Sequence, residues 1–142
     1  MNFNQRVSVL ITRLILGFIF LFQGYGKIFN IGVENLYAMD FFQGTFKDIL
    51  PDFIIRITAY YTSYIELLGG FLLIIGYKTN YALYALASVI IIVTIGHGLA
   101  EPIWDLSHVF PRTILLILLL ILPRDWDTFS VDNLISKLTR SK

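Results

Sequence analysis

The chain has 142 residues, of which 56% are hydrophobic and only 15% are charged. With a mean hydropathy of +0.72, this composition is too apolar for an ordinary soluble domain and predicts a membrane protein. A net charge of +1, with the basic residues scattered around apolar segments, argues against a nucleic-acid partner. The sequence contains no cysteine, which excludes thiol–disulfide exchange, thiolate metal sites, iron–sulfur ligation and covalent haem attachment for this chain acting alone.

Four apolar segments predict an all-α fold, a four-helix transmembrane bundle forming one domain over residues 1–142. A helix needs about 20 residues to cross the hydrocarbon core of a bilayer. The first segment is too long for the apolar core of a signal peptide and no small-residue cleavage site follows it, so we expect it to be retained. The expected spans are residues 7–26, 53–76, 81–99 and 107–123, the last being short without its polar N-terminal shoulder.

Two further helices are expected outside these spans. The aromatic-rich segment 34–42 predicts a short helix on the outer interface, and residues 128–140 predict an amphipathic helix on the anionic inner leaflet. Basic residues concentrate at the N-terminus, in the turn near Lys78 and after the fourth span, which predicts that both termini are cytoplasmic. The apolar stripe of the C-terminal helix consists of Val131, Leu134, Ile135 and Leu138.

A carboxylate, Glu66, stands near the middle of the second span, where an unpaired charge costs several kcal/mol. Small or hydroxylated residues share its helix face, so this face is expected to meet protein. Arg13, about two turns into the antiparallel first span, is its predicted partner. Two interpretations stay open: a structural pair that fixes helix register, or a carboxylate that relays protons or binds a quinone-like headgroup. The face of Glu66 carries Ala59, Thr62, Ser63, Gly69 and Gly70.

Polar residues from all four spans are expected to meet at the outer end of the bundle and to form a ligand site. The Thr62 and Ser63 face would lead inward from there to Glu66. Histidines hydrogen-bonded at helix ends are favoured over a metal site built from His97, Glu101, Asp105 and His108, and over haem ligation, so no metal or haem is predicted. The candidate ligand site comprises Lys27, Arg56, Thr62, Ser63, His97, Glu101, Asp105, His108 and Arg112.

Two motifs carry a resemblance to a known family. The first span reads Arg13-x-x-x-Gly17-x-x-Phe20-x-x-x-Gly24-x-x-Lys27, and the second reads Glu66-x-x-Gly69-Gly70, ending at Gly76-Tyr77-Lys78-Thr79. Together they resemble the DoxX family of small bacterial membrane proteins. The resemblance implies a four-helix, multi-pass protein of the inner membrane, sometimes associated with quinone-linked sulfur oxidation or other redox complexes. The cysteine-pair chemistry of related four-helix redox proteins is not carried over, because this chain has no cysteine.

Three functions follow as hypotheses, and whether the chain is itself an enzyme stays open. The first is a redox-associated, quinone-linked membrane subunit, for which the cofactor would be a quinone. The second is a non-catalytic structural or assembly subunit, supported by the small-residue faces. The third is a small transporter or proton pathway, disfavoured because the sequence has no detectable internal repeat. The expected partners are the lipid bilayer and other membrane subunits or a redox partner.

Overall fold

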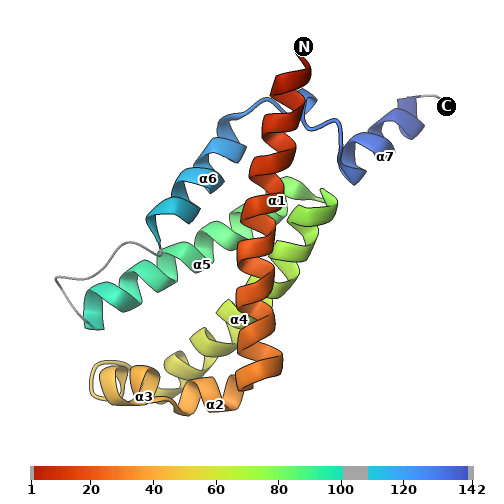
Figure 1. The fold of residues 1–142 in the computed structure, drawn as a ribbon. Helices are drawn as coiled ribbons and strands as arrows, with labels where there is room; N and C mark the ends of the chain where they lie inside the picture. The colour runs from red at the N-terminus through yellow and green to blue at the C-terminus, as the bar shows by residue number, and fades with distance from the viewer. Residues whose placement is uncertain (1, 101–108, 141–142) are drawn as a thin grey trace.

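A computed structural model describes residues 2–100 and 109–140, and this part of the chain contains no β-strand. The start of the first helix and the end of the last helix lie toward the same end of the molecule (Figure 1). The elements are α1 (Phe3–Tyr25), the π-helical η1 (Gly26–Ile31), α2 (Val33–Ala38), α3 (Asp40–Phe46), α4 (Asp52–Ile75), α5 (Thr79–Ala100), α6 (Phe110–Ile121), the 3₁₀ helix η3 (Arg124–Trp126) and α7 (Val131–Arg140).

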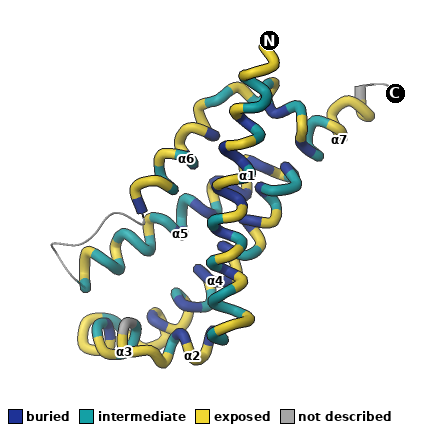
Figure 2. The backbone as a smooth tube through the Cα atoms, viewed as in Figure 1, coloured by how far each residue is buried: buried dark blue, intermediate teal, exposed yellow. Residues whose placement is uncertain are grey.

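Three segments of the described residues are long and apolar enough to cross a membrane: Phe3–Ile31, α4 and α5. The apolar α6 has 12 residues, fewer than a span needs on its own. The all-helical prediction is therefore confirmed with three candidate spans, while a fourth span over 107–123 stays a prediction. Outward-facing residues of the long helices are mostly exposed and apolar, as helices in contact with lipid require (Figure 2).

Glycines bring α1 and α4 into close contact. A Cβ atom on Gly24 would lie 2.3 Å from the backbone nitrogen of Leu67, and one on Gly70 would lie 2.4 Å from that of Leu21. Only glycine allows such an approach, which is how small residues drive helix association in lipid. The prediction that these faces meet protein is confirmed, because Gly17, Gly24 and Gly70 are buried, as is the whole face around Glu66.

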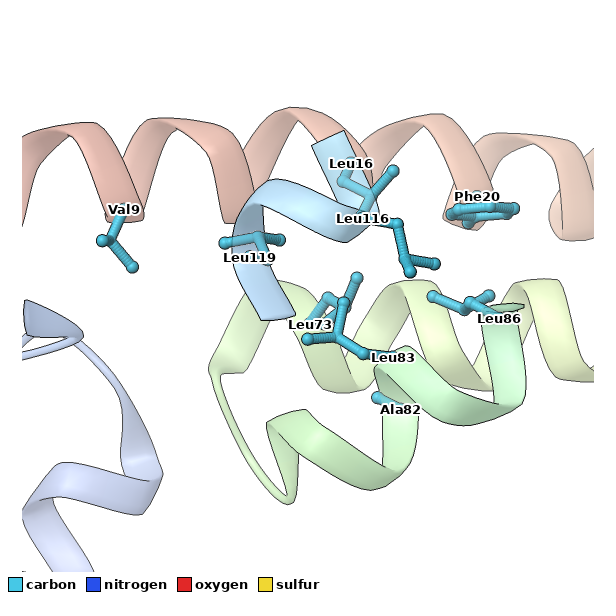
Figure 3. Packing of buried hydrophobic residues seen from close by; sticks show 9 residues of the cluster. All are labelled: Val9, Leu16, Phe20, Leu73, Ala82, Leu83, Leu86, Leu116 and Leu119. Carbon is cyan, nitrogen blue, oxygen red and sulfur yellow. The ribbon is translucent and has the colours of Figure 1, made fainter. Parts of the chain in front are cut away.

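The apolar core collects side chains from α1, α4, α5 and α6 (Figure 3). Its residues come from the inner stripe of each helix; on α1 they are seven and four residues apart. This packing holds the four helices at fixed depths relative to one another, which positions the polar groups described below. The core residues are Val9, Leu16, Phe20, Leu73, Ala82, Leu83, Leu86, Leu116 and Leu119.

The turn between α4 and α5 depends on Gly76. Its φ of 68° lies in the left-handed region, and its N–H caps α4 by donating to the carbonyl oxygen of Leu72 at 2.9 Å. A Cβ atom there would also lie 2.6 Å from Nη1 of Arg13. Both the backbone conformation and the space therefore require glycine.

The predicted interfacial helix over 34–42 is wrong in its extent, because the structure has two short helices, α2 and α3, in this region. Met39 between them has an extended backbone (φ −64°, ψ 151°), which interrupts the helical hydrogen bonds. The break lets both pieces pack inward, since Leu36 of α2 and Phe46 of α3 are each buried.

Candidate functional site

The predicted pairing of Arg13 with Glu66 is wrong, although both residues are buried as expected. The guanidinium of Arg13 donates instead to the carbonyl oxygens of Leu73, Ile74 and Phe129. The reason is depth: Arg13 lies level with the C-terminal end of α4, where the last carbonyls have no partner within the helix and carry the negative end of its dipole. The carboxylate of Asp127 completes this site, with Oδ1 3.3 Å from Arg13 Nε.

The cation that pairs with Glu66 is Lys27 of η1, two residues beyond the end of α1. Lys27 Nζ lies 2.7 Å from Glu66 Oε2, and the exposed fractions of the two side chains are 25% and 2%. The lysine was expected at the outer interface, but its four-carbon stem is long enough to carry the ammonium group inward to the carboxylate. The charge in the middle of α4 is thus compensated by a half-buried ammonium group.

A cavity of about 560 Å³ opens beside this ion pair. Its wall is largely apolar, and its polar groups include the Lys27–Glu66 pair. Such a combination, with a volume inside the range of about 300–1,000 Å³ typical of small-molecule sites, suits an amphipathic ligand. The lining residues come from α1 to α6: Gln23, Lys27, Leu36, Phe42, Phe46, Leu50, Ile54, Ile55, Thr58, Thr62, Glu66, Ile92, Val93, Ile95, Gly96, His97, Leu99 and Arg112.

A second void, of about 10 Å³, lies between Glu66 and Arg112 and is also lined by Phe20. This is about the volume that one water molecule needs. Arg112 is close enough to Glu66 for the two charges to interact, so the carboxylate lies between two cations. The polar end of the cavity is therefore a Lys27–Glu66–Arg112 cluster.

Five predicted site residues line the cavity together: Lys27, Thr62, Glu66, His97 and Arg112. Thr62 is buried and its hydroxyl donates to the Thr58 carbonyl oxygen at 2.9 Å. This hydrogen bond within α4 fixes the orientation of the hydroxyl group.

The other predicted site residues are not at the cavity wall. Ser63 is buried but donates to the Ala59 carbonyl oxygen of its own helix, and it does not line the cavity. Arg56 was expected among the converging residues, which is wrong, because it is 54% exposed and lies 2.8 Å from Glu34 Oε1. Glu101, Asp105 and His108 lie outside the described residues.

Gln23 is a polar cavity residue that was not among the predicted site residues. Its side-chain oxygen Oε1 is buried and accepts no hydrogen bond from the described residues. The available signal was its position, directly before Gly24 on the face of α1 that meets α4. A polar side chain in a membrane helix is costly, so a glutamine next to a close-packing glycine indicates an interior polar group nearby.

Ion pairing and hydrogen bonding outside the bundle fix the helices that close the cavity. Tyr60 donates to Glu34 Oε1 at 2.6 Å, and this bond, together with Arg56, holds the pKa of Glu34 below its ordinary value of 4.5. Tyr37 donates to Asp52. These contacts attach α2 to the beginning of α4, so that Leu36 is held against the cavity.

Within the described residues there is no group of three or more side chains of the types that bind metals. Three of the four residues considered as metal ligands, Glu101, Asp105 and His108, lie outside that part of the chain. The hydrogen-bond donors of the cavity include an ammonium group, a guanidinium group and an amide, which suit oxygen acceptors on an organic headgroup.

Comparison with protein families gives a match to DoxX over residues 8–98. No curated protein and no solved structure matches the chain. The matched segment runs from α1 through α5 and includes Lys27, Glu66 and His97 of the cavity, but not Arg112. Because the match covers more than half of the 142 residues and the structure has the long apolar helices of a membrane protein, this chain belongs to the DoxX family of small membrane proteins.

Proposed function

We propose that this chain is a redox-associated subunit of the bacterial cytoplasmic membrane, and that its cavity binds the headgroup of a quinone. The observation that carries the proposal is the cavity itself, which combines apolar walls with the Lys27–Glu66–Arg112 cluster at the level of the membrane helices. The proposal has both termini on the cytoplasmic side, and the basic residues near Lys78 and beyond α6 support this orientation.

The chemistry of the cluster matches both forms of a quinone headgroup. Lys27, Arg112 and the amide of Gln23 can donate to a ring carbonyl oxygen, whereas Glu66 can accept a hydrogen bond from a ring hydroxyl. The apolar wall suits the isoprenoid tail. Since the sequence contains no cysteine, electrons would pass to or from the ring through a partner subunit rather than through a thiol of this chain.

The test is purification in a neutral detergent, followed by extraction and mass spectrometry of the bound small molecules, and by titration with a short-chain ubiquinone analogue. Glu66→Gln, Arg112→Gln and His97→Gln should each weaken retention of the quinone while helix content stays near wild type. Arg56→Gln is the matched control, because this arginine is exposed and does not line the cavity. If no quinone co-purifies and the analogue does not bind, the quinone function is wrong.

A structural or assembly subunit is the second candidate, favoured by the surface of α5. Only 22% of the most apolar stretch of α5 is buried, against 39% for α1 and for α4. Tyr84 and Ile91 of this helix are exposed and do not line the cavity. Photo-crosslinkers at these two positions should trap a membrane polypeptide if the helix docks a subunit, and lipid alone if it does not.

A further inference from the structure

The polar end of the cavity has more positive than negative charge. Lys27 and Arg112 contribute one positive charge each, and Glu66 contributes one negative charge. With His97 counted as neutral, the described lining residues therefore carry one positive charge in excess. Neither cation is fully solvated, since the Lys27 side chain is 25% exposed and Arg112 is only partly exposed.

Glu66, the carboxylate among the described lining residues, already has a cation partner. Glu66 Oε2 holds the ammonium group of Lys27 at 2.7 Å, and Glu66 is 2% exposed. The guanidinium of Arg112, which carries five N–H donors, shares the same carboxylate only across the small void. A cation in a region of low dielectric gains stability from a second anion, so the cavity offers a site for one negatively charged group.

The rest of the cavity is largely apolar and suits the apolar part of a ligand. Leu36, Phe42 and Phe46 of the two short helices and Ile92 and Ile95 of α5 form its apolar wall. An anionic head on an apolar body is an amphiphile. The volume of about 560 Å³ is in the range of a small molecule rather than of a two-chain phospholipid.

We propose that this cavity binds a single-chain amphiphile with an acidic headgroup, of the fatty-acid class, and that this amphiphile competes with the quinone. Its carboxylate accepts hydrogen bonds from the guanidinium of Arg112 and the ammonium of Lys27, and its chain lies along the apolar wall. The inference rests on the cavity of the proposed function, though not on its redox assignment. It makes the site responsive to free fatty acid in the membrane.

The experiment compares three probes of one chain length on the delipidated full-length protein: oleate, oleyl alcohol and oleylamine, at a pH where oleate is ionised. Binding is measured by equilibrium dialysis in neutral detergent. Oleate should bind at least about tenfold more tightly than the alcohol, which is the effect expected of hydrogen bonds to a charged group, and oleylamine should bind most weakly. Equal affinity for oleate and the alcohol would overturn the inference.

Charge variants sharpen the test. Arg112→Gln should abolish the preference for oleate and leave binding of the alcohol unchanged, whereas Arg112→Lys should retain most of the preference. Glu66→Gln should strengthen oleate binding, because it removes the competing carboxylate, although it weakens quinone binding. Arg56→Gln, an exposed arginine outside the cavity, should change neither. If Glu66→Gln fails to fold, the two Arg112 variants still decide the question.

Competition with the short-chain ubiquinone analogue separates the two proposals. If oleate binds with the stated preference and the analogue does not bind, the fatty-acid site stands and the quinone function falls. If the analogue binds and oleate shows no preference over the alcohol, the reverse holds. Mutual displacement supports both, and the absence of binding by every probe overturns both.

Discussion

Nε of Arg13 lies 3.3 Å from Oδ1 of Asp127, so a buried residue of the first membrane helix is joined to the connection that follows the last apolar helix. The exposed fractions of these side chains are 1% and 6%. Burial raises the pKa of Asp127, and the charges of Arg13 and Arg124 counteract this effect. The C-terminal segment is therefore held to the bundle by a buried ion pair.

The first prediction concerns this pair. Arg13→Gln should destabilise the protein by about 3–5 kcal/mol, because it leaves the Asp127 carboxylate and the α4 carbonyls without their donor. Asp127→Asn should interact with it in a double-mutant cycle measured by unfolding in detergent. The combination of Arg13→Gln with Glu66→Gln should be additive within about 0.5 kcal/mol, and strong coupling there would contradict the observed partners.

The second prediction concerns Lys27 and Glu66. Lys27→Met should lower stability by about 2–3 kcal/mol, the cost of a buried ion pair reduced for the exposure of the lysine, since it leaves the carboxylate uncompensated. The double variant with Glu66→Gln should be less destabilised than the sum of the two. Lys47→Met, at an exposed lysine of the loop after α3, serves as the control and should have no effect. Additivity of the two substitutions would exclude the pair.

A third prediction tests the close contact of α1 and α4. Gly24→Ala and Gly70→Ala should each cost about 1–3 kcal/mol or more, because the added methyl group would meet backbone atoms that cannot move aside. Gly26→Ala, two residues further along the same helical stretch, meets nothing within 4 Å and should be tolerated. Thermal unfolding of the three variants in the same detergent measures the difference. Equal melting temperatures would show that the helices do not approach as closely as described.

The fourth prediction is a pH dependence of the contact between Glu34 of α2 and the beginning of α4. The pKa of Glu34 is lowered in the fold by Tyr60 and Arg56, so the unfolded or detached state binds the proton more readily. The stabilisation is therefore complete above the ordinary pKa of 4.5 and is lost as the pH falls below it. Amide exchange of α2 should speed up relative to α4 between about pH 6 and about pH 3. Glu34→Gln should remove most of this change, and its persistence in that variant would assign it to another group.

Much of this protein could be predicted from local pattern. Apolar runs separated by short polar turns determine the long helices, because a backbone in lipid must satisfy its own hydrogen bonds. The small residues at three- and four-residue spacing around Gly24 and Gly70 determine which faces meet protein. The burial of Arg13 and Glu66 followed from the same spacing and is confirmed.

The partners of those charges could not be predicted in the same way. An arginine or lysine side chain reaches about one helical turn, roughly 5.4 Å, so a depth estimated from sequence leaves several partners within range. Arg13 was assigned to Glu66 on depth alone. The actual partners depend on the position of α1 along α4, and the glycine contacts set this position. They also depend on the path of the chain after α6.

Contacts between segments that are distant in the sequence determine the remaining features of the structure. Asp132 of α7 accepts hydrogen bonds from the backbone N–H groups of Lys78 and Thr79, and so caps α5 from 53 residues away. Lys27 reaches Glu66 because η1 continues the helical span that begins with α1. The sequence by itself determined which residues must be hidden from lipid, since that depends on the periodicity of one helix. Only the tertiary structure decided which hidden groups meet, because that depends on the relative depth of helices that no local pattern records.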